Sequence, residues 1–200
     1  MSAPTDDGRI RCPWPLGSQL YLDYHDTEWG RTLHGDDALY ERMSLEAFQS
    51  GLSWITILRK RPAFRAAFAD FAIERVAGFG PAEVERLLTD VGIVRNRAKI
   101  EATIANARIA VELDGGLDAL LWSFAPPARP RPRTGAEIPA VTPESTAMAR
   151  ALKKRGFRFV GPTTAYALMQ AVGMVDDHVA DCWVRFEDSF SNSPVREEAG

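Results

Sequence analysis

The chain has 200 residues, of which 46% are hydrophobic and 26% are charged, and its formal net charge is −3. These values are typical of one soluble domain with a single core, and the sequence contains no apolar run long enough to cross a membrane. The first nine residues, MSAPTDDGR, also lack the apolar stretch of a secretory signal. We therefore expect a monomeric cytoplasmic protein with reduced thiols and no membrane partner.

Basic residues are concentrated in two segments. Residues 59–110 carry ten basic and six acidic side chains, and residues 150–158 carry five basic side chains and no acidic one. A concentrated positive face is what phosphate binding requires, whatever the overall charge. Taken singly, each segment is better explained as a solvated helix face.

Helical periodicity dominates the chain, and no segment shows the alternation of a sustained strand. Asp36 can cap the first predicted helix, which Gly51 ends. In chain order, we predict about eight helices: Asp36–Ser50, Ser53–Arg59, Pro62–Asp70, Pro81–Gly92, Arg95–Leu113, Leu117–Phe124, Thr142–Arg155 and Pro162–Gly173.

The stretch 126–143 contains six prolines and predicts an extended surface loop, because so many prolines disrupt the backbone hydrogen bonds of a helix or a sheet. We expect an all-α fold, an irregular helical bundle that forms a single domain over residues 12–187. Residues 1–11 and 188–200 are expected to be disordered tails.

Two cysteines and two histidines form two pairs near opposite ends of the chain. Cys12 and His25 lie 13 residues apart, and His178 and Cys182 lie four apart, on one face of a helical turn. Two thiolates and two imidazoles make a closed tetrahedral zinc site that would staple the termini without an open position for chemistry. Two buried cysteines and two hydrogen-bonded histidines explain the spacing about equally well.

Residues 87–99, LLTDVGIVRNRAK, have the pattern of a helix, a tight apolar hairpin and the basic start of a second helix. Such a helix-hairpin-helix motif directs backbone amides and a helix N-terminus toward a DNA phosphate. The candidate contacts are Gly92, Arg95, Arg97 and Lys99. Because the hairpin holds only one glycine, an ordinary helical turn is nearly as good an explanation.

Glu46 is the unusual residue of the first predicted helix, because it lies at the edge of the apolar stripe formed by Leu39 and Met43. A carboxylate there either reaches out to solvent at the rim or faces a pocket. Aromatic residues of the neighbouring segments favour a pocket: Trp14, Tyr21, Tyr24, Trp29 and Trp54. Pockets for a flipped base combine stacking surfaces with a few groups that read the base edge, although aromatic density alone is more often core.

Several blocks of the chain, in order, resemble 3-methyladenine DNA glycosylase I, a small zinc-containing bacterial family of the helix-hairpin-helix superfamily. The resemblance extends from about Cys12 to Trp183 and rests on YHDTEWG (24–30), GLSWIT (51–56), ALKKRGF (151–157), FVG (159–161) and DHV (177–179). It implies that a structural Zn²⁺ is bound by Cys12, His25, His178 and Cys182.

The resemblance also implies a base pocket. Glu46 would hydrogen-bond the excised base with help from Tyr24, while Trp54 and Trp14 provide stacking surfaces. Tyr21, in the same aromatic group, is expected to contribute to this pocket.

At the corner formed by Gly51 and Leu52, the resemblance implies that Leu52 enters the duplex where the base leaves. Asp176 matches the stretch that carries the catalytic aspartate in other helix-hairpin-helix glycosylases. We favour a structural role for Asp176, beside the metal ligand His178.

The implied activity is hydrolysis of the N-glycosidic bond of 3-methyladenine in double-stranded alkylated DNA, after base flipping. The methylated base is cationic and leaves readily, so an anionic Glu46 and an electron-rich Trp54 would favour it over neutral adenine. No lysine stands out in the pocket blocks, which predicts a monofunctional enzyme without lyase activity. Two alternatives stay open: a catalytically inactive zinc-stapled DNA-binding protein, and a zinc hydrolase, which needs an open coordination position.

Overall fold

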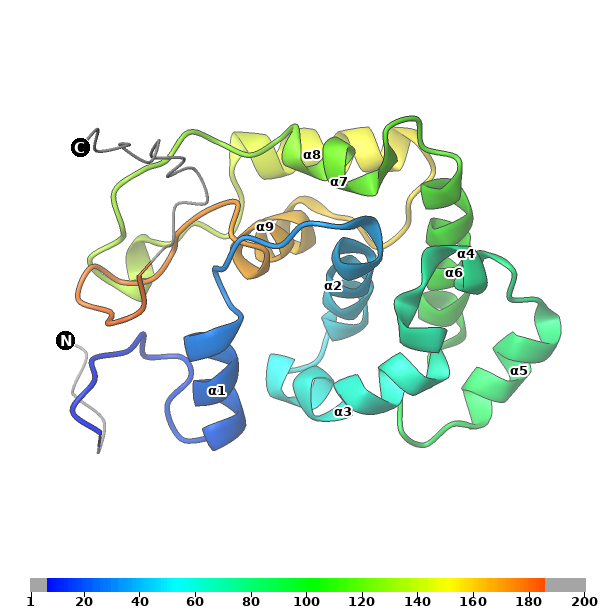
Figure 1. The fold of residues 1–200 in the computed structure, drawn as a ribbon, viewed down its shortest axis with the longest axis horizontal. Coiled ribbons are helices and arrows are strands. Elements are labelled where there is room, and N and C mark those ends of the chain that lie inside the picture. The colour runs from blue at the N-terminus through cyan, green and yellow to red at the C-terminus, as the bar shows by residue number, and fades with distance from the viewer. Residues whose placement is uncertain (1–6, 186–200) are drawn as a thin grey trace, which may run out of the picture.

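The structure is a computed structural model that describes residues 7–185 of the chain, and within this range it is all-helical (Figure 1). The α-helices of the described range are α1 (Gln19–Thr27), α2 (Asp36–Gln49), α3 (Trp54–Ala67), α4 (Ile73–Ala77), α5 (Pro81–Thr89), α6 (Arg97–Val111), α7 (Gly116–Trp122), α8 (Pro143–Lys154) and α9 (Pro162–Ala171). Two short 3₁₀ turns cover Ala69–Phe71 and Gly135–Glu137. Among residues 7–185, no helix has both the length and the apolar character that a bilayer crossing requires. The predicted all-α fold is confirmed.

Three helices differ from the prediction. Helix α1 was not predicted, because its buried residues are only Tyr24 and His25 and it has no long apolar stripe. Helix α4 has five residues and is too short to show a period. The two helices predicted on either side of Pro62 are one helix, α3, which costs a backbone hydrogen bond but keeps Ile57 and Phe64 on one buried face.

Helix α2 is the centre of the bundle. It packs against α3, α6, α7 and α9, and every residue from Leu39 to Phe48 is buried. Such a helix has no solvated face, so its polar residues must be paired with other groups or face a cavity. This position explains why Glu46, in the last turn of α2, is not a rim residue.

The two ends of the described chain meet beside the helical body. A small second core of Cys12, Val179, Cys182 and Val184 joins them, and the Trp183 amide donates to the Ile10 carbonyl at 2.8 Å. Figure 1 shows the N-terminal and C-terminal segments on the same side of the molecule.

The expected disordered tails lie largely outside the described residues, which leave out 1–6 and 186–200. Arg11, however, is buried, and its guanidinium donates to the carboxylates of Asp7, which lies on the surface, and Asp26. Packed structure therefore begins before Cys12, where we had expected the domain to start.

The predicted proline-rich loop is confirmed, since residues 126–142 contain no helix apart from the 3₁₀ turn Gly135–Glu137. Two arginines of the loop fasten it to the segment that precedes His178. Arg129 pairs with Asp177 and Arg131 pairs with Asp176, each at 2.6 Å.

Candidate functional site

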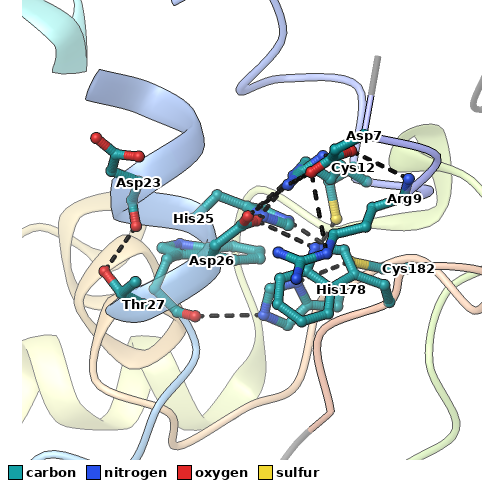
Figure 2. A network of polar contacts seen from close by, with 12 residues as sticks. Asp7, Arg9, Cys12, Asp23, His25, Asp26, Thr27, His178 and Cys182 are labelled. Atoms are coloured by element: carbon teal, nitrogen blue, oxygen red, sulfur yellow. Dashed lines mark hydrogen bonds and ion pairs between the residues drawn. The ribbon is translucent and has the colours of Figure 1, made fainter. Parts of the chain in front are cut away.

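Cys12, His25, His178 and Cys182 converge on one point (Figure 2). One donor atom of each lies within 4.8 Å of the other three, and all four residues are buried. The Cys182 Sγ lies 3.6 Å from both His25 Nε2 and His178 Nδ1, and the Cys12 Sγ lies 3.7 Å from His178 Nδ1. Tetrahedral zinc with its usual bond lengths would place sulfur and nitrogen ligands about 3.6 Å apart, so the donor set fits this ion.

Both histidines are held in the tautomer that a metal requires. The His25 Nδ1 lies 2.8 Å from Asp26 Oδ1, and the His178 Nε2 lies 3.2 Å from the Trp29 carbonyl oxygen. These acceptors take the ring N–H, which leaves His25 Nε2 and His178 Nδ1 as lone-pair donors toward the cluster. Arg11 donates to Asp26 and fixes this carboxylate in turn.

One thiol and one glycine near the cluster also suit a metal site. Contact with Cys12, followed by contacts with His178 and His25, lowers the pKa of the Cys182 thiol although burial opposes the shift. Gly30 lets the chain pass close to the cluster, because a Cβ atom there would lie 2.9 Å from His178 Nε2. Its φ of 74° also favours glycine.

A cavity of about 240 Å³ lies beside the cluster and shares its aromatic walls. It is smaller than the roughly 300 to 1,000 Å³ of sites for drug-sized ligands, so it suits one planar ring system. Its lining residues come from helices α1, α2, α3 and α9 and from the intervening loops: Trp14, Tyr24, Trp29, Glu46, Gln49, Trp54, Ile138, Ala167 and Gln170.

Four of the five residues that we expected to bind a base line this cavity, namely Trp14, Tyr24, Glu46 and Trp54. The Tyr24 ring lies 5.5 Å from the Trp54 ring at 48°, and 6.3 Å from the Trp14 ring at 63°. The indole Nε1 atoms of Trp14 and Trp54 are buried and have no hydrogen-bond partner within residues 7–185. The tilted aromatic faces of Trp14, Tyr24 and Trp54 are suited to bind a planar ring system.

Glu46 is the acidic group of the cavity, and only 6% of it is exposed. Burial raises the pKa of its carboxyl group to about 8, and the positive charge of Arg42 opposes the shift. This raised pKa favours a neutral carboxyl group at pH 7. A cation bound beside it would favour the carboxylate.

Tyr21, the fifth predicted base contact, lies behind the cavity wall. Its ring packs edge-on against Trp14 at 5.5 Å, and its hydroxyl accepts a hydrogen bond from the Ile55 amide at 2.8 Å. The structure thus places Tyr21 as a support for Trp14 and for the start of α3, where we had expected a contact with the base.

Five lining residues were not predicted as site residues. Trp29 belongs to the aromatic group noted in the sequence, and Ile138 is an apolar residue in the proline-rich loop. Ala167 and Gln170 lie three residues apart on one face of α9, but nothing in their sequence distinguishes this face from core. Gln49 follows the buried run of α2, and no signal marked it.

The corner after α2 presents an apolar tip to solvent. Gly51 has a φ of 82°, which favours glycine, and Leu52 is 41% exposed. An exposed leucine on a tight corner has the geometry of the predicted wedge.

Helices α5 and α6 and residues 90–96 between them form the predicted helix-hairpin-helix motif. Gly92 is required by close packing, since a Cβ atom there would lie 2.8 Å from Ala63 Cβ. Its amide donates to the Asp90 side chain at 2.7 Å, so the folded hairpin already uses one of the amides expected at a phosphate. Arg95 and Arg97 are exposed, and Arg97 forms an ion pair of 2.8 Å with Glu85.

The structure contradicts the prediction that Lys99 contacts a phosphate. It is buried, and its Nζ donates to the carbonyl oxygens of Phe48 at 2.9 Å and Ser50 at 2.6 Å. Lys99 therefore caps the C-terminal end of α2 and ties the Gly51–Leu52 corner to the hairpin.

Asp176 does not line the cavity. Its carboxylate accepts hydrogen bonds from Arg131 at 2.6 Å and from the His178 amide at 3.2 Å. Through these contacts, Asp176 orients the segment that carries His178 and holds the proline-rich loop beside it.

Together, the fold and the site define a helix-hairpin-helix protein with a purine-sized aromatic pocket, a buried carboxyl group and a neighbouring donor set for zinc. A family model described as methyladenine glycosylase matches residues 14–186. The chain belongs to the methyladenine glycosylase family.

Curated relatives and solved structures agree with this assignment. The chain is 45% identical over 177 residues to DNA-3-methyladenine glycosylase 1 of Escherichia coli (strain K12), with 86% of this chain and 95% of that protein covered. It is 42% identical to DNA-3-methyladenine glycosylase of Haemophilus influenzae, with 86% and 96% covered. A crystal structure of 3-methyladenine DNA glycosylase I matches with a TM-score of 0.83 at 44% identity, covering 86% of this chain and 98% of the other. A structure of the Staphylococcus aureus enzyme, described as showing the basis of 3-methyladenine recognition, matches with a TM-score of 0.83 at 34% identity, with 87% and 95% covered.

Proposed function

We infer that this protein is a DNA glycosylase that releases 3-methyladenine from alkylated DNA. The observation that carries the inference is the buried Glu46 in a cavity walled by Trp14, Tyr24 and Trp54. A single purine fits between such aromatic faces only after it has left the base stack, which means that the nucleotide is flipped. Residues 12–187 would act as one glycosylase domain.

Charge is the basis of lesion recognition in this proposal. Methylation of adenine at N3 leaves the base cationic while it is attached to the sugar. The positive ring would favour ionisation of Glu46 and bind to the electron-rich indoles of Trp14 and Trp54. Neutral adenine gains neither interaction and would have to share the cavity with an acid that stays protonated.

The same charge makes strong acid catalysis unnecessary, because a cationic base is a good leaving group. The C–N bond breaks with its electron pair going to the base, and water then attacks the resulting sugar cation and releases a proton. The four lysines of the chain, Lys60, Lys99, Lys153 and Lys154, do not line the cavity, which supports a monofunctional glycosylase without lyase activity.

Double-stranded DNA would be held by two elements that lie next to each other. The exposed Leu52 would fill the gap left by the flipped base, while the hairpin around Gly92 and the exposed Arg95 and Arg97 would approach the phosphate backbone. Binding of this kind does not depend on sequence and falls with salt. A monomer suffices, since all of these groups belong to one chain.

Zinc would be held by Cys12, His25, His178 and Cys182, and would cross-link the two ends of the domain. Four protein ligands leave no open position, which argues against a zinc hydrolase. A cytoplasmic location would keep the two thiols reduced and available for the metal.

The test is release of free base from methylated DNA by purified protein, measured by chromatography. The wild type should release 3-methyladenine, and Glu46→Gln should lose at least about a hundredfold in rate while DNA affinity changes little. A wild type that binds DNA but releases no base would instead support a catalytically inactive DNA-binding protein.

A further inference from the structure

Gln170 is a polar residue of the cavity that the mechanism above does not use. It lies on α9 one turn after Tyr166, and it lines the cavity together with Glu46. Its Nε2 lies 2.8 Å from Asp177 Oδ2, and its Oε1 forms no hydrogen bond with any residue of the described range.

The orientation of this amide is fixed by a buried network. Arg129 donates to Asp177 Oδ1 at 2.6 Å and to the Tyr166 hydroxyl at 2.5 Å. Because the Tyr166 oxygen accepts from Arg129, its own proton is directed to Asp177 Oδ2 at 2.6 Å. Asp177 is thus an acceptor for all of its neighbours, and Gln170 must turn its NH₂ group toward it. The atom left for the cavity is the acceptor Oε1.

The chemistry of the lesion identifies what this acceptor can bind. In a 3-methyladenine nucleotide, N3 is methylated, N9 is bonded to the sugar, and N1 and N7 have no hydrogen. The exocyclic amino group at C6 is the only N–H donor of the base. In 3-methylguanine the same ring position carries a carbonyl oxygen, which an amide oxygen repels.

We propose that Gln170 is a specificity-determining residue, whose Oε1 accepts a hydrogen bond from the C6 amino group and disfavours a C6 carbonyl. The proposal rests on the proposed function and adds a second group to Glu46. Asp177 is the positioning residue, since it holds Gln170 in the only orientation that presents an acceptor. Through Arg129 the same carboxylate also fastens the proline-rich loop that contributes Ile138 to the cavity.

The test compares Gln170→Met with the wild type as full-length, zinc-loaded proteins. Methionine keeps the length of the side chain and removes both polar atoms. Binding of free 3-methyladenine and of free 3-methylguanine is titrated by tryptophan fluorescence. We expect the variant to bind 3-methyladenine about five to ten times more weakly, as for the loss of one hydrogen bond, and 3-methylguanine no more weakly than the wild type.

Gln19→Met is a matched control, because Gln19 also donates its amide to an aspartate, Asp23, at 2.7 Å but lies on the exposed side of α1. It should bind both bases as the wild type does. Zinc content and melting temperature are measured for each protein. Unchanged binding of 3-methyladenine by Gln170→Met, or an equal loss for both bases, overturns the proposal. A wild type that binds no 3-methyladenine overturns the proposed function itself.

Discussion

Because Glu46 is buried, we predict that its carboxyl group lowers the stability of the folded protein as the pH rises. Burial raises the pKa of its carboxyl group from the ordinary 4.5 to about 8. Between these values the unfolded chain loses the proton and the folded protein keeps it, so the free energy of unfolding falls with pH by about 1.36 kcal/mol per pH unit. Glu46→Gln removes this dependence with little change in shape.

Relative to the wild type, the Glu46→Gln variant should therefore gain stability as the pH rises. From pH 6 to pH 8 the difference in the free energy of unfolding should widen by roughly 2 kcal/mol, and the difference in melting temperature by roughly 4 to 8 °C. The buried amide adds an offset that does not vary with pH, so the slope is the informative quantity. Both proteins are unfolded by heat and by urea at saturating zinc across this range.

Glu112→Gln, the same exchange at an exposed position at the end of α6, is the control, and the slope of Glu46→Gln is compared with it. A slope for Glu46→Gln no steeper than that of the control would refute the reasoning, because it would mean that Glu46 is ionised in the folded protein. The expected result would show that the folded protein keeps a buried acid at a cost in stability.

Four other predictions concern single side chains of the site and the hairpin. Cys182→Ser should lose bound zinc, measured by atomic emission on the purified protein, and should melt at least about 10 °C below the wild type because the ends of the chain are no longer joined. Trp54→Leu should weaken binding of 3-methyladenine by about tenfold or more, measured by calorimetry, with the fold preserved in circular dichroism. Lys99→Met should lower the free energy of unfolding by about 1 to 3 kcal/mol in urea titrations, since two carbonyl oxygens lose their charged donor, while the salt dependence of DNA binding stays as in the wild type. Arg95→Ala should show the opposite pattern, with unchanged stability and a salt slope of DNA affinity that is smaller by about one.

Local sequence signals were sufficient where the physics is local. Helix α5 begins at Pro81 and α8 begins at Pro143 after the Thr142 cap, as a rigid φ and a capping hydroxyl dictate. The prolines of residues 126–143 likewise determined that this stretch is a loop. The spacing of Cys12, His25, His178 and Cys182 fitted a zinc site and a set of buried core residues about equally well, and only the resemblance to the family favoured the zinc site.

Only the tertiary structure decided which polar side chains bind other groups of the protein and which face the cavity or the solvent. Lys99 lies in a basic helix start like Arg95 and Arg97, yet it is buried against the end of α2, and no local pattern distinguishes the three. Tyr21 and Tyr24 are both aromatic residues of α1, but only Tyr24 faces the cavity. The orientation of Gln170 depends on Asp177 and Arg129, which come from segments far apart in the chain. Short-range preferences fix where a helix begins and ends, whereas the identity of a side chain's neighbours is set by how whole helices pack.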